Sequence, residues 1–310
     1  MRATRPFRFG IQAGAGFGLQ DPRTWMEHAR MAEDIGYAVL LAPDHFAPFL
    51  SPLPALAAAA QATSHIRLGT LVINQAWRHP AVLAKEAATV DLLSGGRLEL
   101  GLGTGWVPRE QAQVGIAFEP FAERFARFAE YVAVVKGLLR QPSFTFSGTY
   151  YQIQELEQQP RPVQPRLPIM IGGYGRRVLE LASREADILS FASVPSPPGD
   201  PYEVLDGRLR WVAAFASDHL ADIELSLNCA GPGPVGATPA SGRQTREPFG
   251  GTSRRDTPSA LAGSVSAIVD KLIAQRERYG ISYITYFPSG SDYPAAVRAF
   301  GQVVRRLAGT

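Results

Sequence analysis

Cysteine is nearly absent from this chain of 310 residues, which contains only Cys229. A single cysteine can form no internal disulfide, and such a composition is typical of a reducing compartment. We therefore expect a cytoplasmic protein in which Cys229 is a small buried side chain within the apolar run 223–229. The chain also lacks cysteine clusters and a His-Glu-x-x-His motif, so we expect no metal site.

Long hydrophobic runs and strong charge of one sign are missing as well. The most apolar segment, residues 38–60, contains Asp44, His45 and four prolines, which argues against a membrane span. Lys and Arg number 31 against 28 Asp and Glu, and the basic residues are scattered. We therefore expect no membrane and no nucleic acid as partner. The small positive excess favours a small, phosphorylated molecule.

Short apolar runs alternate with helical patterns along the chain. Strands are predicted over 7–11, 37–42, 66–73, 97–102, 168–171, 187–191, 223–229 and 282–287. Helices are predicted over 22–36, 80–93, 120–139, 176–184, 201–220, 258–279 and 293–307, with one more after Pro52. This alternation is typical of an α/β protein with a (β/α)8 TIM barrel. A doubly wound sheet is the alternative, but no Gly-x-Gly-x-x-Gly follows the first strand.

Two stretches interrupt the alternation without enough apolar residues for a core of their own. Residues 141–166 are rich in Pro and Gln, and residues 231–257 are rich in Gly and Pro. Both are predicted to be insertions in a single barrel domain over 1–310, and the second is expected to be mobile.

Candidate catalytic residues are sought at the carboxyl ends of the strands, where barrel active sites lie. Asp44 and His45 follow the second strand. An imidazole titrates near neutral pH, so His45 is a candidate for proton transfer, with a packed loop histidine as the alternative. Asp44 can contact a polar cofactor edge. Four aromatic residues near the same strand ends suggest an apolar pocket wall: Phe46, Phe49, Trp77 and Trp106.

Two glycine-rich strand ends suggest contact with a ligand. Gly101, Gly103 and Gly105 alternate, and would let a flat group approach the backbone closely. The run from Ile171 to Arg177 contains Gly172, Gly173, Tyr174, Gly175 and Arg176 and opens a predicted helix. Backbone N–H groups at a helix start, together with an arginine, favour a phosphate site, although a plain strand–helix turn would use the same glycines.

Taken together, these motifs resemble the bacterial-luciferase-like group of flavin- and deazaflavin-dependent oxidoreductases. The resemblance covers most of residues 7–191, and is more distant over 258–308. It rests on the segments 78–80, 83–85, 91–97, 101–106, 168–173 and 185–187. It implies a (β/α)8 barrel with an insertion, often dimeric, so we expect a homodimer.

The resemblance also assigns roles to residues. It implies a flavin or deazaflavin ring above a bulge after the third strand, with a cis peptide for which Leu71-Val72 is the best match. Asp44 and His45 would lie beside the ring, with His45 as a proposed proton-transfer residue. Thr104 and Gly105 would line the cofactor, and residues 172–176 would hold its phosphate.

Trp106 departs from the family pattern. The best-known deazaflavin-dependent sugar-phosphate dehydrogenases of this group carry a glutamate there, so their acid–base pair and substrate do not transfer directly. Glu110 lies four residues further on and cannot simply be assumed to replace that glutamate.

The leading hypothesis is an oxidoreductase that moves a hydride between the deazaflavin coenzyme F420 and a small organic substrate. A monooxygenase that uses reduced FMN and oxygen is a close alternative. A non-redox barrel isomerase or lyase acting on a phosphorylated substrate is another, and so is a cofactor-binding protein without catalysis.

Overall fold

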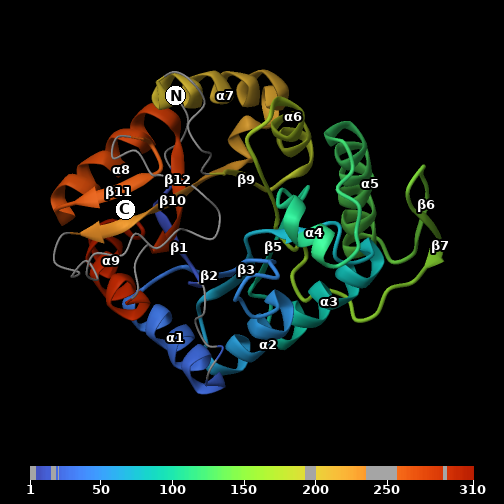
Figure 1. Ribbon diagram of the computed structural model, residues 1–310, viewed down its shortest axis with the longest axis horizontal. Coiled ribbons are helices and arrows are strands. Elements are labelled where there is room, and N and C mark those ends of the chain that lie inside the picture. Colours follow the sequence, from blue (N-terminus) through green and yellow to red (C-terminus); the bar gives the residue numbers. More distant parts are fainter. Residues whose placement is uncertain (1–4, 15–18, 20, 193–199, 235–256, 289–291) are drawn as a thin grey trace.

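Parallel strands close into a barrel in the computed structural model, which describes residues 5–14, 19, 21–192, 200–234, 257–288 and 292–310 (Figure 1). In order around the barrel the strands are β1 (Arg8–Gln12), β2 (Val39–Ala42), β3 (Arg67–Thr70), β5 (Leu98–Gly103), β8 (Ile169–Gly173), β9 (Ile188–Phe191), β10 (Glu224–Pro234) and β12 (Ile281–Pro288). The barrel closes because β10 pairs with both β9 and β12, and β12 pairs with β1. The predicted (β/α)8 barrel is confirmed.

Helices surround the barrel in Figure 1. They are α1 (Pro22–Ile35), α2 (Pro52–Ala62), α3 (Pro80–Leu93), α4 (Pro108–Gln113), α5 (Phe121–Arg140), α6 (Arg176–Glu185), α7 (Pro201–Ala216), the short 3-10 helix η1 (Ser217–Ala221), α8 (Val265–Tyr279) and α9 (Tyr293–Leu307). Local chemistry sets several boundaries. Asp21 and Asp200 accept hydrogen bonds from backbone N–H groups in the first turns of α1 and α7. Gly36 ends α1 in the left-handed conformation, with φ of 99°.

Two apolar layers result from this arrangement. The larger core lies between the strands and the surrounding helices. A smaller cluster consists of Val39, Leu41, Leu71, Met170, Ile188 and Tyr283, side chains contributed by strands and strand ends of the barrel. The barrel is therefore packed with side chains, as is usual for this architecture. Within the described residues, every helix is too short or too polar to cross a bilayer.

The predicted third strand, 66–73, is interrupted in the structure. Strand β3 ends at Thr70, and a two-residue strand β4 (Ile73–Asn74) follows and pairs with β5. Between them, the Leu71-Val72 peptide bond is cis, as the resemblance implied. The strand end therefore forms a bulge at the carboxyl end of the barrel.

The structure corrects three predicted segments. The predicted helix 258–279 begins at Val265, because Ala260–Gly263 forms strand β11 beside β10 and the Ser264 hydroxyl caps α8. The insertion 141–166 contains an antiparallel hairpin, β6 (Phe144–Ser147) and β7 (Gln152–Leu156), which projects beyond α5 in Figure 1. Residues 231–234 of the other insertion belong to β10. Residues 235–256, on which the expected mobility falls, lie outside the described residues.

Candidate active site

His45 and Glu110 form a hydrogen-bonded pair at the carboxyl end of the barrel. His45 lies in the loop after β2, and its Nδ1 is 2.9 Å from Oε2 of Glu110 in α4. The other oxygen of Glu110 accepts a hydrogen bond from the backbone N–H of Ala47 at 3.3 Å. Since a carboxylate only accepts, Nδ1 carries the donated proton, and Nε2 is the basic nitrogen of the neutral ring.

Glu110 was not assigned a role from the sequence. It is buried, with 7% of its surface exposed, although it lies in the first turn of a short surface helix. Its contact with His45 joins residues that are 65 positions apart in the chain. The sequence showed only a glutamate a few residues after a glycine-rich strand end, and its burial cannot be read from local spacing.

Asp44 connects the loop after β2 to the loop that follows β4. Its carboxylate forms a bidentate pair with Arg78, at 2.7 and 3.2 Å, and accepts the backbone N–H of Asn74 at 3.0 Å. Its backbone oxygen accepts the indole N–H of Trp77 at 3.2 Å. These bonds hold both loops against each other beside His45. A direct contact between Asp44 and a cofactor stays a prediction.

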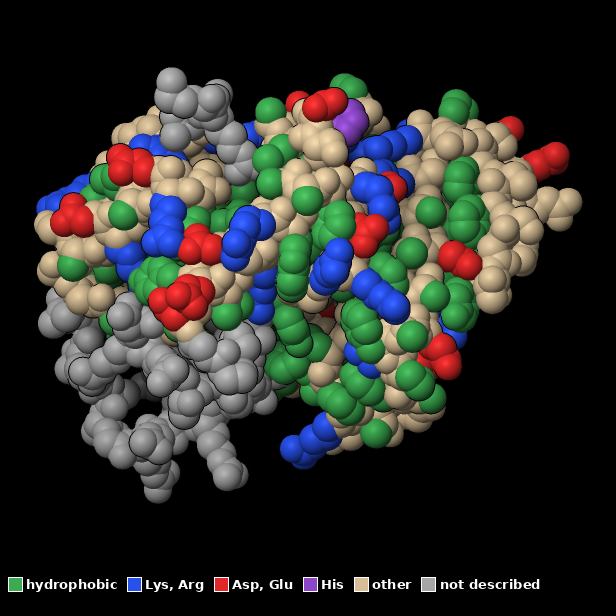
Figure 2. Space-filling view, turned by 90° about the horizontal axis from the view of Figure 1, so that it is seen from above, with side chains coloured by type: hydrophobic (Ala, Val, Ile, Leu, Met, Phe, Trp, Pro, Cys, Tyr) green, Lys and Arg blue, Asp and Glu red, His purple; other side chains and the backbone are tan. Residues whose placement is uncertain are grey.

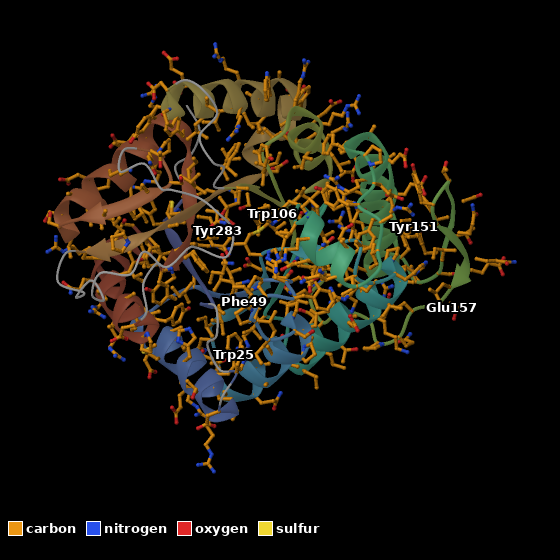
Figure 3. The ribbon with its side chains drawn as sticks, in the orientation of Figure 1. Trp25, Phe49, Trp106, Tyr151, Glu157 and Tyr283 are labelled. Carbon is orange, nitrogen blue, oxygen red and sulfur yellow. The ribbon has the colours of Figure 1, made fainter. Side chains whose placement is uncertain are left out.

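Four aromatic side chains gather around this pair of loops. Trp106 meets the His45 ring edge-on, with centroids 6.0 Å apart, and Phe49 lies 6.2 Å from the same ring. Phe46 packs edge-on against Trp77 at 4.9 Å. Phe46 and Trp106 nevertheless leave 61% and 55% of their surfaces exposed. Phe49 and Trp106 lie over the centre of the barrel in Figure 3, where they can wall an apolar pocket.

The glycines of β5 do not leave an open face for a flat ligand, which corrects the sequence-based interpretation. A Cβ at Gly101 would lie 2.0 Å from the backbone oxygen of Thr70, and one at Gly103 would lie 2.5 Å from a methyl group of Val72. A Cβ at Gly172 of β8 would also approach Val72, at 3.1 Å. The glycines therefore make room for the β3–β4 bulge, and the Val72 side chain fills the space beside them.

The start of α6 has the features of a phosphate site in the part of the chain that is described. Among those residues, no side chain caps the helix at Gly175, and a Cβ there would meet nothing within 4 Å. Tyr174 is half-exposed beside it, and Arg208 lies over the Tyr174 ring at 5.5 Å. The exposed Arg176 lies near the ring of Phe215, at 5.7 Å. Uncapped N–H groups at a helix start fit an anionic group, so the residues present suit a phosphate-bearing cofactor.

Two further predicted cofactor residues lie near the end of β5. Thr104 is half-buried, and Gly105 adopts a φ of 75°, which favours glycine. A Cβ at Gly105 would approach the Asn74 side chain at 2.5 Å. Gly105 therefore lies close to the loop after β4. Leu71 belongs to the apolar cluster within the barrel. The cofactor roles of these residues stay predictions.

The charge on the described surface is mixed. On the face shown in Figure 2, basic, acidic and hydrophobic side chains alternate across the part of the chain that is described. No group of three or more potential His, Cys, Asp or Glu metal ligands gathers among the described residues.

Comparison with known proteins adds relatives of stated function. F420-dependent glucose-6-phosphate dehydrogenase from Amycolatopsis mediterranei (strain U-32) is 34% identical over 177 residues, which are 54% of this chain and 52% of that protein. The chain spans about half the length of such curated relatives. The solved structure of F420-dependent tetrahydromethanopterin reductase from Methanopyrus kandleri has a TM-score of 0.77 at 20% identity, covering 97% of this chain and 99% of that one.

A second solved structure has a different stated function. A monooxygenase from Streptomyces bottropensis has a TM-score of 0.75 at 22% identity, covering 97% of this chain and 98% of that one. At these identities the structural matches establish the barrel fold. The family model described as luciferase-like monooxygenase matches residues 5–231, and the chain therefore belongs to the luciferase-like monooxygenase family.

Proposed function

We propose that this protein is an oxidoreductase that transfers a hydride between the deazaflavin coenzyme F420 and a small organic substrate. The observation that carries the proposal is the His45–Glu110 pair, which orients the imidazole in the loop after β2, where the adjacent Asp44 binds the Asn74 backbone of β4. The F420-dependent activities named for the relatives support the choice of coenzyme. The proposal includes a homodimer that acts in the cytoplasm.

The chain's own residues provide binding, orientation and proton transfer. When bound, the coenzyme supplies the hydride chemistry. His45 delivers a proton to the substrate oxygen as hydride reaches the adjacent carbon, and accepts that proton in the reverse direction. Glu110 accepts a hydrogen bond from Nδ1 of His45, so that Nε2 is the nitrogen that exchanges a proton with the substrate. Phe49 and Trp106 pack around the His45 ring, with centroids 6.2 and 6.0 Å from it.

The coenzyme would be held by backbone groups more than by charged side chains. The open start of α6 at Gly175 suits its phosphate, with Gly172, Gly173, Tyr174 and Arg176 nearby. Thr104, Gly105, Asp44, Leu71 and Val72 would line the ring end of the site. Trp106, in place of a carboxylate, favours an apolar substrate over a sugar phosphate.

A monooxygenase that uses reduced FMN and oxygen is the second candidate, favoured by the fold shared with the Streptomyces bottropensis enzyme. Two titrations of the purified protein separate the candidates, one with oxidised F420 and one with FMN. We expect F420 to bind with micromolar or tighter affinity and FMN to bind more weakly. A preference for FMN would support the monooxygenase, and binding of neither would return the non-redox isomerase or lyase to first place.

Replacing His45 tests the proton-transfer step. His45→Ala should lower turnover by about a hundredfold or more, the range expected for loss of a general acid–base, while F420 affinity changes little. His219→Ala is the matched control, because the His219 side chain is 83% exposed and lies in η1. Turnover of His45→Ala equal to that of the control would remove His45 from the mechanism.

A further inference from the structure

The strand residues that line the barrel change from charged to uncharged along its axis. Arg8, Arg67, Glu99 and Glu224 lie at the amino ends of β1, β3, β5 and β10, where Arg8 and Arg67 bind Glu99 and Arg8 also binds Glu224. The described barrel strands contain no other Lys, Arg, Asp or Glu. The carboxyl end of the barrel interior, where the candidate active site lies, is therefore lined by uncharged strand residues.

Two amide side chains face this end of the interior. Neighbouring residues of a strand point to opposite faces of the sheet. Ile11 of β1 and Leu227 and Cys229 of β10 belong to the core between strands and helices, so Gln12 and Asn228 face the barrel interior. Both amides are partly exposed, whereas the preceding inward-facing residue of each strand is buried. The accessible part of the interior therefore begins at these two side chains.

Gln12 and Asn228 lie on either side of β12. Gly10 and Asn228 both pair with Thr285, and Gln12 is two residues further along β1 than Gly10. Strand spacing and rise then place the two Cα atoms about 12 Å apart, so one small ligand can reach both amides. Tyr293 donates a hydrogen bond of 2.6 Å to the backbone oxygen of Gln12 and holds this residue in place. No hydrogen bond between described residues involves either side-chain amide.

The two amides lie across the barrel from the β3–β4 bulge. Among the eight strands, β10 is the fourth from β3 in either direction and β12 is the fourth from β5, as Figure 1 shows. The bulge half is lined by Leu71 and Val72, with Gly103 and Gly172 beside Val72. The carboxyl end of the interior therefore has one apolar half and one half that presents amides.

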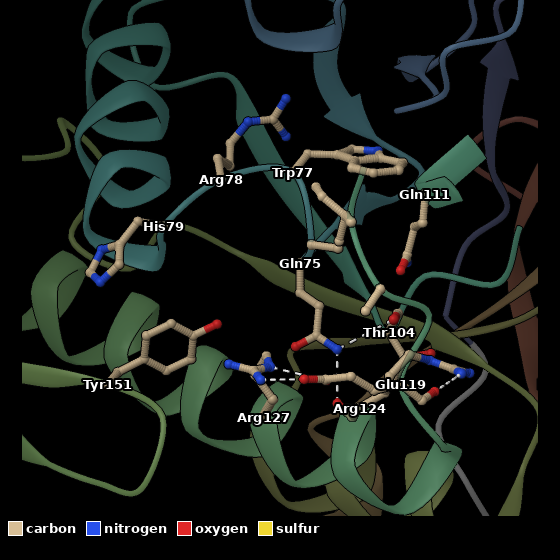
Figure 4. A pocket seen from close by; sticks show the side chains of 13 residues that line it. Gln75, Trp77, Arg78, His79, Thr104, Gln111, Glu119, Arg124, Arg127 and Tyr151 are labelled. Carbon is tan, nitrogen blue, oxygen red and sulfur yellow. Dashed lines mark hydrogen bonds and ion pairs between the residues drawn. The ribbon is translucent and has the colours of Figure 1, made fainter. Parts of the chain in front are cut away.

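Charged groups beside the bulge pair with each other. Arg78, in the loop after β4, binds Asp44, and Arg127 of α5 binds Glu119. Both arginines line a pocket of about 490 Å³ between the loop after β4 and α5 (Figure 4). An anionic group that entered the interior beside β10 and β12 would therefore lose hydration without meeting a cation from the described strands.

We propose that Gln12 and Asn228 bind an uncharged polar group of the substrate, such as a hydroxyl, a carbonyl or an amide, and select neutral compounds over carboxylates and phosphates. A side-chain amide both donates and accepts, so it complements neutral groups of either kind. Phe49 and Trp106, over the centre of the barrel in Figure 3, provide apolar surface for the body of such a substrate. This inference rests on the proposed function, because it names the substrate class of the same site.

Benzamide and benzoate test this selection, because they have nearly the same shape and differ in charge. In ligand-observed NMR titrations of the purified protein, benzamide should bind about tenfold tighter than benzoate or better, since only the carboxylate must give up ionic hydration. Equal affinities, tighter binding of benzoate, or no binding of benzamide would overturn the proposal.

Substitutions of the two amides test the residues. Gln12→Leu and Asn228→Leu each remove a hydrogen-bonding group and should weaken benzamide binding about tenfold. Gln12→Glu keeps the shape of the side chain and adds a negative charge, so it should widen the preference for benzamide even if a leucine variant folds poorly. Gln302→Leu is the control, because Gln302 is exposed on α9. Benzamide affinities of both leucine variants equal to that of the control, or an unchanged preference in Gln12→Glu, would contradict the assignment.

A benzamide titration in the presence of F420 separates this inference from the proposed function. F420 should leave benzamide bound, because the two amides lie across the barrel from the bulge. Displacement of benzamide by F420 would place it in the ring site and overturn the assignment to Gln12 and Asn228. If F420 does not bind, the proposed function fails, whereas the titrations without F420 still decide whether these amides select neutral compounds.

Discussion

Individual buried polar residues hold distant parts of this barrel in register. The Asp44 carboxylate is the clearest case, because it binds Arg78 and the Asn74 backbone and so joins two loops beside His45. Glu33, near the C-terminal end of α1, acts similarly, because its carboxylate accepts hydrogen bonds from the backbone N–H groups of Ser64, His65 and Ile66. These hydrogen bonds lower the pKa of Glu33 despite its partial burial. Each such residue satisfies loop backbone that would otherwise be unpaired.

His28 is expected to make stability fall in acid. Burial in α1, beside Tyr293, lowers its pKa to about 3 from an ordinary value near 6.5. Below about pH 6.5 His28 therefore binds a proton in the unfolded chain but not in the folded chain. The free energy of unfolding consequently decreases as the pH falls from 6.5 toward 3. Between pH 6.5 and 4.5 the loss from this residue is about 2–3 kcal/mol.

Urea unfolding at both pH values measures this effect. His28→Gln keeps a side-chain amide that can donate to Tyr293 and cannot titrate. The difference in unfolding free energy between pH 6.5 and 4.5 should shrink by about 2 kcal/mol in this variant. The exposed His219→Gln serves as control and should behave as the wild type. An identical pH dependence in all three proteins would contradict the assignment to His28.

At the scale of elements, the β3–β4 bulge and the glycines of β5 form one unit. Thr70 and Gly101 exchange two hydrogen bonds, with the Thr70 hydroxyl donating to the Gly101 oxygen and accepting the Gly101 N–H. Val72 then packs over Gly103 and Gly172. The bulge therefore depends on missing side chains in two neighbouring strands.

Gly101→Ala should disrupt this unit. The added Cβ would lie 2.0 Å from a backbone oxygen, so strand β3 or β5 must move, and we expect about 3 kcal/mol of lost stability, at the upper end for overpacking. Gly207→Ala, in the middle of α7, is the matched control. Its Cβ would meet only the end of Arg210 at 3.9 Å, and helix propensity predicts a gain of about 0.5–1 kcal/mol. If Gly101→Ala and Gly207→Ala unfolded at the same urea concentration, the role of Gly101 would be refuted.

At the scale of the whole molecule, a network of charged side chains links strands from different parts of the barrel. Glu99 of β5 is 2% exposed. Its carboxylate accepts two hydrogen bonds of 3.0 Å from Arg8 of β1 and one of 2.5 Å from Arg67 of β3. Arg8 also approaches Glu224 of β10 at 3.2 Å. The ion pairs therefore connect four strands that meet only when the barrel closes.

Glu99→Ala is expected to cost about 3–5 kcal/mol, because it leaves two guanidinium groups partly buried beside an apolar core without their shared anion. Glu180→Ala is the comparison. It removes a helix-surface pair with Arg184 and should cost no more than about 0.5 kcal/mol. Equilibrium unfolding in urea measures both. A Glu99→Ala protein as stable as Glu180→Ala would show that the network contributes nothing to the closed barrel.

The sequence by itself determined the fold class and the position of most barrel strands and helices. Apolar runs, proline at helix starts and capping Asp residues act over a few positions, so they could be recognised without the structure. The break of the predicted helix at Ser264 was missed because β11 forms only by pairing with β10. In the same way, Gly101 and Gly103 were read as space for a ligand, since nothing local shows that Val72 and Thr70 occupy it.

Only the tertiary structure decided how the site is assembled. His45 could be chosen from its place at a strand end, but its partner Glu110 lies 65 residues away. In the same way, the Gln75 side chain donates to the backbone oxygen of Arg124, 49 residues away. Hydrogen bonds between such distant residues depend on barrel closure, which brings all strand ends to one face. Local patterns therefore predicted candidate site residues, and the closed barrel determined which of them lie together.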